Sequence, residues 1–122
     1  TTLVVGGSTR YHSVQNGIQQ IKNHSVVFVH DGVRCLVTPN LIKRCFEQTI
    51  EKGSAIPAVT CTDSVRILNN DSYKAINRDQ VKIIQTPQTF LSSILIPAFN
   101  QPYQEFFTDE ATVVESLGQA VH

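Results

Sequence analysis

Long apolar runs and an excess of one charge are both missing from this sequence. No stretch among its 122 residues approaches the roughly 20 consecutive apolar residues that a membrane-spanning helix requires. Ten basic residues balance ten acidic ones, whereas a broad nucleic-acid-binding surface usually shows as a basic excess. We therefore expect neither a membrane segment nor a nucleic-acid partner, although a few well-placed arginines can still hold a small phosphorylated ligand.

Cysteine is scarce, and its spacing is not that of a disulfide framework or a zinc site. Cys35, Cys45 and Cys61 are odd in number, and no Cys-x-x-Cys motif occurs. A disulfide framework and a zinc site are therefore not expected, and we predict no metal site built from the protein's own side chains. We interpret the three cysteines as reduced, packed thiols of a cytoplasmic protein.

The sequence also lacks the common catalytic signatures. It has no Gly-x-Ser-x-Gly elbow, no His-Glu-x-x-His and no Walker loop. The Gly-x-Gly-x-x-Gly fingerprint is missing as well, which argues against a dinucleotide-binding dehydrogenase. These absences suit direct nucleotidyl transfer, in which one phosphate attacks another in line while the protein supplies position and positive charge.

What the chain does contain is an alternation of strand-like and helix-like segments. Its 41% hydrophobic and 16% charged residues are typical of a globular domain. The alternation predicts α/β architecture, with a mostly parallel sheet and helices on both faces. We expect strands at 3–5, 25–29 and 55–59, a further strand starting within 119–122, and helices from 13, over 38–53, over 90–99 and over 108–118.

A β-hairpin is expected to interrupt this alternation. Residues 65–68 and 73–76 are strand-like, and the polar turn 69–72 separates them. We therefore predict a protruding hairpin arm within residues 63–80.

Two polar segments directly follow expected strands, where ligands collect in parallel sheets. Gly6-Gly7-Ser8-Thr9-Arg10 precedes Ser13 near a helix start. Its glycines allow a ligand to approach the backbone, and a helix start offers free amide donors. A tight turn with a solvated arginine is the alternative interpretation.

The second segment is His30-Asp31-Gly32-Val33-Arg34. Asp31 suits a sugar hydroxyl or a magnesium ion, and Arg34 suits a phosphate; the alternative is a purely structural pair. We assign His30 to packing or backbone hydrogen bonding, because adjacent strand residues point to opposite faces. Further polar segments, at 63–66 and 85–88, indicate only a hairpin edge and a loop when taken singly.

Taken in order, the polar segments resemble the 2-C-methyl-D-erythritol 4-phosphate cytidylyltransferase family. The resemblance covers nearly the whole chain and rests on four motifs, each weak alone but specific in this order. They are Gly6-Gly7-x-x-Arg10-x-x-Ser13-Val14-x-x-Gly17, Val29-His30-Asp31-x-x-Arg34, Asp63-Ser64-Val65-Arg66 with Arg78 after the hairpin, and Gln85-Thr86-Pro87-Gln88-x-Phe90. The helix start Thr108-Asp109-Glu110-Ala111 also fits.

The resemblance implies a Rossmann-like nucleotidyltransferase fold of the nucleotide-diphospho-sugar transferase type. It implies transfer of CMP from CTP to 2-C-methyl-D-erythritol 4-phosphate, a step of non-mevalonate isoprenoid biosynthesis. It also implies a magnesium ion held largely by the substrate phosphates, and a homodimer formed through the hairpin arm at 63–80.

The resemblance further implies roles for individual residues, some of them catalytic. Asp31, between CTP and the acceptor hydroxyls, Arg34, facing the acceptor, and Arg78, reaching across the dimer, are the expected catalytic residues. The remaining implied contacts are Gly7, Ser8, Arg10 and Ser13 on the cytosine and CTP side, and Ser64 and Thr86, together with Arg78, at the acceptor phosphate.

The sequence departs from the family pattern in several places. Gly32-Val33-Arg34-Cys35 stands where Ala-Ala-Arg-Pro is usual, Ser8 where an acidic residue is frequent, and Ser64 where threonine is common. The family's glycine-rich loop with arginine and lysine and its Asn-x-Lys-x-Thr segment do not occur here. We therefore expect residues 1–122 to be an interior part of a single domain, truncated at both ends and weakly active or inactive alone.

Two other functions remain open from the sequence. A ribitol-5-phosphate cytidylyltransferase shares the four motifs and differs in the acceptor that it takes. The other is not an enzymatic function: the chain would be a non-catalytic remnant, or an interaction module formed by the hairpin arm.

Overall fold

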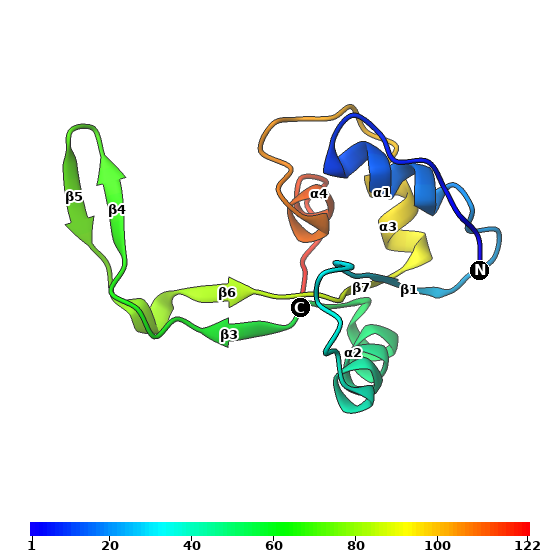
Figure 1. The fold of residues 1–122 in the computed structure, drawn as a ribbon, viewed down its shortest axis with the longest axis horizontal. Helices are drawn as coiled ribbons and strands as arrows, with labels where there is room; N and C mark the ends of the chain where they lie inside the picture. Colours follow the sequence, from blue (N-terminus) through cyan, green and yellow to red (C-terminus); the bar gives the residue numbers. More distant parts are fainter.

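The computed structural model describes residues 1–122 and consists of a body and a long arm (Figure 1). The body is a small sheet with helices on both faces, and the arm is a two-stranded ribbon that extends from it. No helix combines the length and the apolar character needed to cross a membrane. In chain order the elements are α1 (Arg10–Ile18), β1 (Val26–Val29), α2 (Pro39–Lys52), β2 (Ser54–Ala55), β3 (Ala58–Thr60), β4 (Arg66–Asn69), β5 (Ser72–Ala75), η1 (Arg78–Gln80), β6 (Lys82–Ile84), β7 (Gln88–Leu91), α3 (Ser92–Ala98) and α4 (Glu110–Glu115).

The sheet of the body has three strands in the order β1-β7-β2. The central strand β7 is antiparallel to both neighbours, with Phe90 opposite Val27 of β1 and Thr89 opposite Ala55 of β2. The strand pairs of the arm are antiparallel as well. The expectation of a mostly parallel sheet is therefore wrong for this chain. β1 and β2 do run in the same direction, but β7 lies between them and runs the opposite way.

Helix α2 covers one face of the sheet, and its ends follow from local chemistry. Thr38 is the N-cap, and its hydroxyl accepts a hydrogen bond from the Leu41 backbone N–H at 3.3 Å. Pro39 occupies the first helical position, where a missing N–H costs nothing. Gly53 ends the helix at φ 89°, a left-handed conformation that favours glycine. The predicted helix at 38–53 is confirmed.

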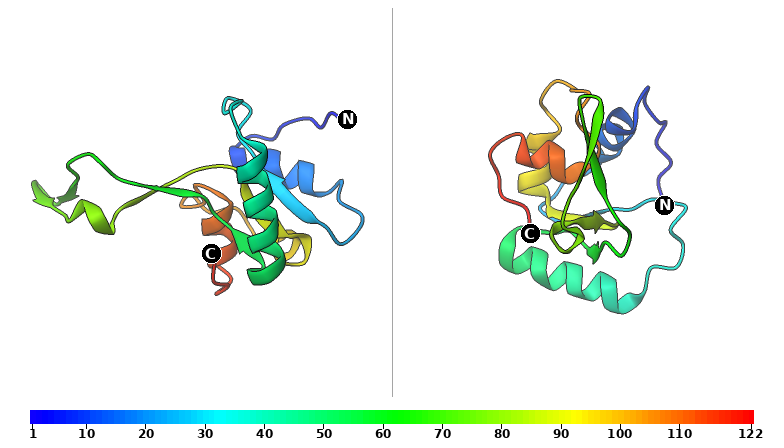
Figure 2. Two further views of the ribbon diagram at one scale, coloured as in Figure 1. Left: turned by 90° about the horizontal axis from the view of Figure 1, so that it is seen from below. Right: turned by 90° about the vertical axis from the view of Figure 1, so that its left-hand side faces the viewer.

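Helices α1, α3 and α4 lie on the opposite face of the sheet (Figures 1 and 2). Their shared core contains Phe90 and Leu95, both with no exposed surface. Tyr11 of α1 stacks on Phe99 with 4.8 Å between ring centroids. Its hydroxyl donates to the backbone carbonyls of Phe99, at 3.1 Å, and Gln101, at 2.6 Å. These contacts fix α1 to the body, and with it the glycine segment that precedes the helix.

The terminal segments do not form the expected strands. Residues 1–7 have no regular secondary structure, and Leu3 is 96% exposed. No strand of this chain lies beside them, so their backbone has no ladder to join; the Val5 carbonyl accepts only from the Asn16 side chain, at 3.1 Å. At the other end, the His122 carbonyl accepts from the Ile56 N–H at 2.6 Å without forming a regular strand.

Three other elements have boundaries that differ from the predicted ones. The strand at 55–59 divides at Ile56–Pro57 into β2 and β3, because proline cannot donate to a ladder. The helix expected over 90–99 begins only at Ser92, since the residues before it belong to β7. Helix α1 begins at Arg10, with Thr9 as its N-cap, so Ser13 lies in its first turn.

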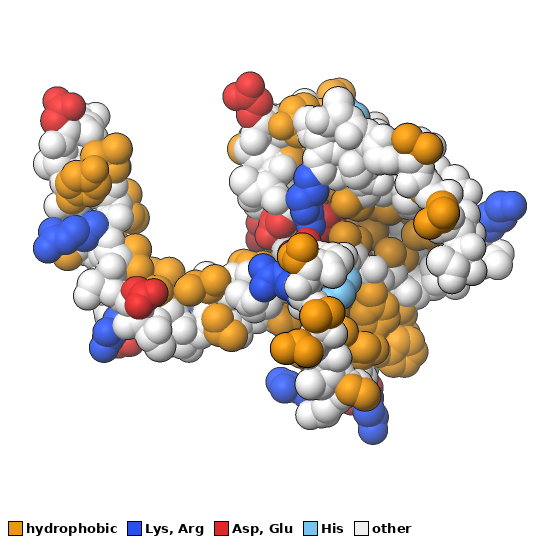
Figure 3. Space-filling model, viewed as in Figure 1, with side chains coloured by type: hydrophobic (Ala, Val, Ile, Leu, Met, Phe, Trp, Pro, Cys, Tyr) orange, Lys and Arg blue, Asp and Glu red, His pale blue; other side chains and the backbone are white.

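The arm is built from two successive strand pairs. β3 and β6 leave the body together, and β4 and β5 form the hairpin at its end, with Leu68 opposite Tyr73. Asn70 in the turn adopts φ 52°, a conformation that asparagine tolerates. Figure 1 shows the hairpin standing far from the body, and Figure 3 shows hydrophobic side chains along the arm surface. Within this chain the arm therefore contacts little besides itself.

Candidate active site

The glycine segment is held in a compact turn before α1. The backbone N–H of Gly7 donates to Ser13 Oγ at 2.9 Å, and Ser13 Oγ donates to the Thr9 carbonyl at 3.0 Å. A Cβ atom on Gly7 would lie 2.3 Å from Cβ of His12, so a larger residue does not fit. Ser8 lies beside them, with its Oγ 3.3 Å from Nδ1 of His12. The four residues predicted on the cytosine side thus occupy one short stretch.

Arg10, the fourth of those residues, forms a two-pronged ion pair with Glu110 of α4. Its terminal nitrogens donate to Glu110 Oε1 at 2.6 Å and to Oε2 at 2.9 Å. The Glu110 side chain has no exposed surface, whereas that of Arg10 is 44% exposed. The hydrogen bond to Glu110 raises the pKa of Arg10 above its usual value, against the opposing effect of partial burial. Arg10 therefore stays charged, and its two charge-assisted hydrogen bonds hold it firmly against Glu110.

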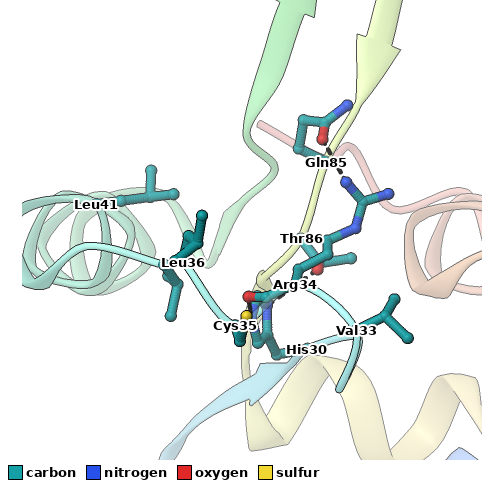
Figure 4. A pocket seen from close by; sticks show the side chains of 9 residues that line it. His30, Val33, Arg34, Cys35, Leu36, Leu41, Gln85 and Thr86 are labelled. Carbon is teal, nitrogen blue, oxygen red and sulfur yellow. Dashed lines mark hydrogen bonds between the residues drawn. The ribbon is translucent and has the colours of Figure 1, made fainter.

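Asp31 lies between Arg10 and Arg34. Its Oδ1 is 3.8 Å from Arg10, and its Oδ2 accepts from Arg34 Nε at 2.9 Å. Arg34 also donates to Gln85 Oε1 at 2.6 Å, a bond drawn in Figure 4. The structural pair considered for Asp31 and Arg34 therefore exists, and it faces the same cluster as the glycine segment. Figure 3 shows basic and acidic side chains gathered at the centre of this face.

His30 connects the Arg34 loop with the segment before β7. Its Nε2 lies 2.9 Å from the Arg34 carbonyl, and its Nδ1 lies 3.0 Å from Thr86 Oγ1. Because a carbonyl only accepts, Nε2 carries a proton; in a neutral ring Nδ1 then accepts from Thr86. Thr86 Oγ1 in turn accepts from the Asp31 N–H at 3.3 Å. The expected backbone hydrogen bonding of His30 is confirmed, and it brings Thr86 to Asp31.

An open groove of about 360 Å³ lies beside this cluster. Figure 4 shows Leu36 and Leu41 on one side of it, Arg34 reaching toward Gln85 on the other, and Val33 pointing away. Nine residues line the groove: His30, Val33, Arg34, Cys35, Leu36, Val37, Leu41, Gln85 and Thr86. A groove with apolar walls and a guanidinium at its edge suits a small phosphorylated molecule.

Two predicted residues lie elsewhere. Ser64 and Arg78 belong to the arm, and Arg78 donates to the Thr62 carbonyl at 2.8 Å. Figure 1 shows that part of the arm well away from the body. Within one chain, the structure therefore brings together the predicted residues of the glycine segment, Asp31, Arg34 and Thr86, but not those of the arm.

Two residues of the site were not singled out from the sequence. Glu110 was noted only within the helix start 108–111 that fits the family, and Gln85 only within a polar loop and the fourth motif; neither was given a role. Glu110 is in phase with Val113 and Val114, which are buried on the same helix. An acid on the apolar face of a helix needs a partner, so this spacing was an available signal. Gln85 gave no comparable signal.

Acidic and metal-binding side chains do not gather into a metal site. No group of three or more His, Cys, Asp or Glu residues is placed to hold an ion. Both oxygens of the Asp31 carboxylate already face guanidinium groups. The side chains of this chain therefore fit a cation only if most of its ligands come from elsewhere, such as substrate phosphates.

The fold is shared with solved nucleotidyltransferases. The 2-C-methyl-D-erythritol 4-phosphate cytidylyltransferase of Thermus thermophilus matches with a TM-score of 0.80 and 28% identity, over 95% of this chain and 58% of that one. That of Francisella tularensis matches with a TM-score of 0.78 and 30% identity, over the same shares of the two chains. This chain therefore has the fold of the nucleotidyltransferase class.

Sequence comparison narrows the class further. Residues 1–122 match the family described as 2-C-methyl-D-erythritol 4-phosphate cytidylyltransferase. The chain belongs to this family. It is 41% identical over 117 residues to the member from Bacteroides thetaiotaomicron, covering 96% of this chain and 53% of that protein. It is 43% identical over 113 residues to the member from Porphyromonas gingivalis, covering 93% and 51%. The chain thus spans about half the length of the curated relatives it matches.

Proposed function

We propose that the protein containing this chain transfers CMP from CTP to 2-C-methyl-D-erythritol 4-phosphate. A phosphate oxygen of the acceptor attacks the α-phosphorus of CTP, the bond from that phosphorus to the β-phosphate oxygen breaks, and pyrophosphate leaves. The observation that carries the proposal is the convergence of Arg10, Asp31, Arg34 and Thr86 beside the glycine segment. Family membership supplies the substrates.

The geometry supports a division of labour within the cluster. Gly7 and Ser13 bring backbone and hydroxyl groups to a close-fitting turn that suits the cytosine side. Arg34 and Thr86 border the groove, where they suit the acceptor phosphate. Asp31 lies between these two regions and suits the acceptor hydroxyls. Arg34 supplies charge and position without a covalent intermediate.

The charge of the cluster supports a role for further cations. Arg10 and Arg34 are balanced by Asp31 and Glu110, so these four side chains sum to zero. CTP and the acceptor phosphate together carry about six negative charges, which need partners once they leave water. We propose that magnesium, bound largely by the substrate phosphates, and basic groups from the rest of the full-length protein supply this balance.

We also propose a homodimer formed through the arm. Leu68 and Tyr73 face one another across the hairpin and are 60% and 67% exposed. Exposed apolar side chains of this size on a two-stranded ribbon favour burial against a partner. A second copy would bring Ser64 and Arg78 to a groove that they do not reach within one chain. The cytoplasm is the proposed compartment, since the three cysteines are free.

Pyrophosphate release tests the catalytic proposal. The full-length protein should release pyrophosphate from CTP only when 2-C-methyl-D-erythritol 4-phosphate and magnesium are present. Asp31→Asn should lower kcat/KM by about 100-fold, the size of losing one organising electrostatic group. Glu51→Gln, which alters an exposed acid of α2, should leave the rate unchanged. CTP that stays intact under these conditions would refute the proposal.

A further inference from the structure

Glu110 is the most deeply buried acid of the site. Its side chain has no exposed surface, and both of its carboxylate oxygens accept from Arg10. A buried carboxylate is costly unless it is paired and hydrogen-bonded. Arg10 meets that requirement from a position 100 residues away in the sequence. The pair therefore fixes the Arg10 guanidinium as firmly as it fixes Glu110.

The backbone around Glu110 is also held in place. Asp109 and Thr112 form a capping box at the start of α4. The Gln88 side chain donates to Asp109 Oδ2 at 2.9 Å and accepts from the Ala111 N–H at 2.8 Å. Because Gln88 is itself the first residue of the buried strand β7, the start of α4 is tied to the sheet. Glu110 thus has little freedom to follow any movement of Arg10.

The other side of Arg10 faces Asp31. The same terminal nitrogen that binds Glu110 Oε2 lies 3.8 Å from Asp31 Oδ1. Arg34 holds the second oxygen of that carboxylate at 2.9 Å. Each oxygen of Asp31 is therefore faced by a different guanidinium. Arg34 lies on the same loop as Asp31 and is held by Gln85 beside the sheet, so Arg10 is the contact that ties the Asp31 carboxylate to helices α1 and α4.

We propose that Glu110 is a positioning residue that acts on Asp31 through Arg10. The carboxylate anchors the guanidinium, and the guanidinium sets the place of Asp31 Oδ1, where the acceptor hydroxyls bind. Glu110 touches neither substrate. This inference rests on the proposed cytidylyl transfer and adds to it a residue that governs the acceptor side of the site.

A competing arrangement gives a different kinetic result. If Arg10 gripped the CTP phosphates directly, Glu110 would serve as its counter-charge and its loss would alter binding of CTP. Under our proposal, loss of Glu110 weakens catalysis with the acceptor and leaves CTP binding unchanged, because Asp31 is the group that is displaced. The Michaelis constants for the two substrates separate these cases.

The test uses the full-length protein and four variants: Glu110→Gln, Asp31→Asn, their combination, and Glu115→Gln. Glu115 is an exposed acid at the end of the same helix and is the matched control. Glu110→Gln should lower kcat/KM for the acceptor about tenfold, the scale of a small misplacement of a catalytic group. The KM for CTP should change less than about twofold, and Glu115→Gln should match the parent.

The combined variant shows whether the effect passes through Asp31. Because Asp31 and Glu110 do not touch, independent losses would multiply. Our proposal predicts that Glu110→Gln has no further effect when Asp31 is already asparagine. A merely structural role would instead lower activity equally in both backgrounds, and that result overturns the inference.

A substitute variant and the activity of the parent protein complete the test of the role of Glu110. If Glu110→Gln does not fold, Arg10→Lys takes its place, since lysine keeps the charge but loses the two-pronged bond; the same shift in acceptor kinetics is expected. An active parent whose acceptor kinetics are unchanged by either variant overturns the inference alone. A parent that forms no CDP product overturns the proposed function, and the inference with it.

Discussion

A Cβ atom on Gly7 would lie 2.3 Å from Cβ of His12, closer than two such atoms approach in proteins. The same residue donates its N–H to Ser13 Oγ at 2.9 Å. The turn before α1 is therefore closed on itself, and only a residue without a side chain fits at its centre. Under the proposed function, this turn is the part of the body that the cytosine base would approach.

Gly7→Ala should displace this turn and weaken CTP binding. We expect KM for CTP to rise about tenfold, as one hydrogen bond to the ligand is lost or misplaced. Gly17→Ala is the matched control, because nothing lies within 4 Å of a Cβ at that helical position. It should leave KM unchanged and stabilise the protein by about 0.5–1 kcal/mol. Equal kinetics for the two variants would contradict a close-fitting nucleotide turn.

Thiol labelling followed by mass spectrometry should distinguish the three cysteines. Cys35 is exposed at the groove, whereas Cys45 and Cys61 are buried. Burial also raises the pKa of the Cys45 thiol, which lowers its reactive thiolate fraction. Iodoacetamide should therefore modify Cys35 first. In the full-length protein, 2-C-methyl-D-erythritol 4-phosphate should slow that modification; unchanged labelling would place the acceptor outside the groove.

Mixing two inactive variants should test whether Arg78 acts in the partner's site. We expect Asp31→Asn to remove the contribution of the body to the site and Arg78→Ala to remove that of the arm; the body and the arm lie apart within one chain. In a random homodimer mixture, half of the dimers are mixed and each contains one intact site, so about a quarter of parental activity should return. Coexpression of the two variants supplies the mixture. No recovery would mean that Arg78 serves its own subunit or no site at all.

Tyr11 should make the fold sensitive to alkaline pH. Burial raises the pKa of its phenol, so the folded state holds the proton more tightly than the unfolded state. The resulting stability is complete below the unfolded pKa of about 10 and is lost as pH rises toward the folded value.

Urea unfolding between pH 9 and 11 checks this effect, in a Cys45→Ala background that removes the second alkaline group. Tyr11→Phe should flatten the pH dependence. It should also lower the free energy of unfolding by about 1 kcal/mol at neutral pH, because the hydroxyl no longer donates to backbone carbonyls. A slope that Tyr11→Phe leaves unchanged would assign the effect to another group.

Local signals predicted the elements that depend on local chemistry. Thr38, Pro39 and Gly53 fixed both ends of α2 without reference to the rest of the chain. The predicted parallel direction of the strands was wrong, because strand pairing depends on residues that are distant in the sequence. Phe90 and Leu91 are two apolar residues in the stretch 88–99, whose mixed pattern suits either a strand or a helix, and only their pairing with β1 and β2 decides for the strand.

The contacts of the site also differ in how far they could be predicted from local sequence. Asp31 and Arg34 lie three residues apart, and their pairing was the alternative interpretation that the sequence offered. Arg10 and Glu110 lie 100 residues apart, and their ion pair depends on how α1 and α4 pack across the core. Gln85 reaches Arg34 only because β7 returns to lie beside β1.

A competition between two acceptors distinguishes the proposed transfer to 2-C-methyl-D-erythritol 4-phosphate from the alternative transfer to ribitol 5-phosphate. The full-length protein is given CTP, magnesium and equal amounts of 2-C-methyl-D-erythritol 4-phosphate and ribitol 5-phosphate, and its products are identified by mass. We expect CDP-methylerythritol to form in large excess, with one pyrophosphate released for each molecule made, as the proposed function requires. CDP-ribitol as the main product, or no CDP product from either acceptor, would contradict it.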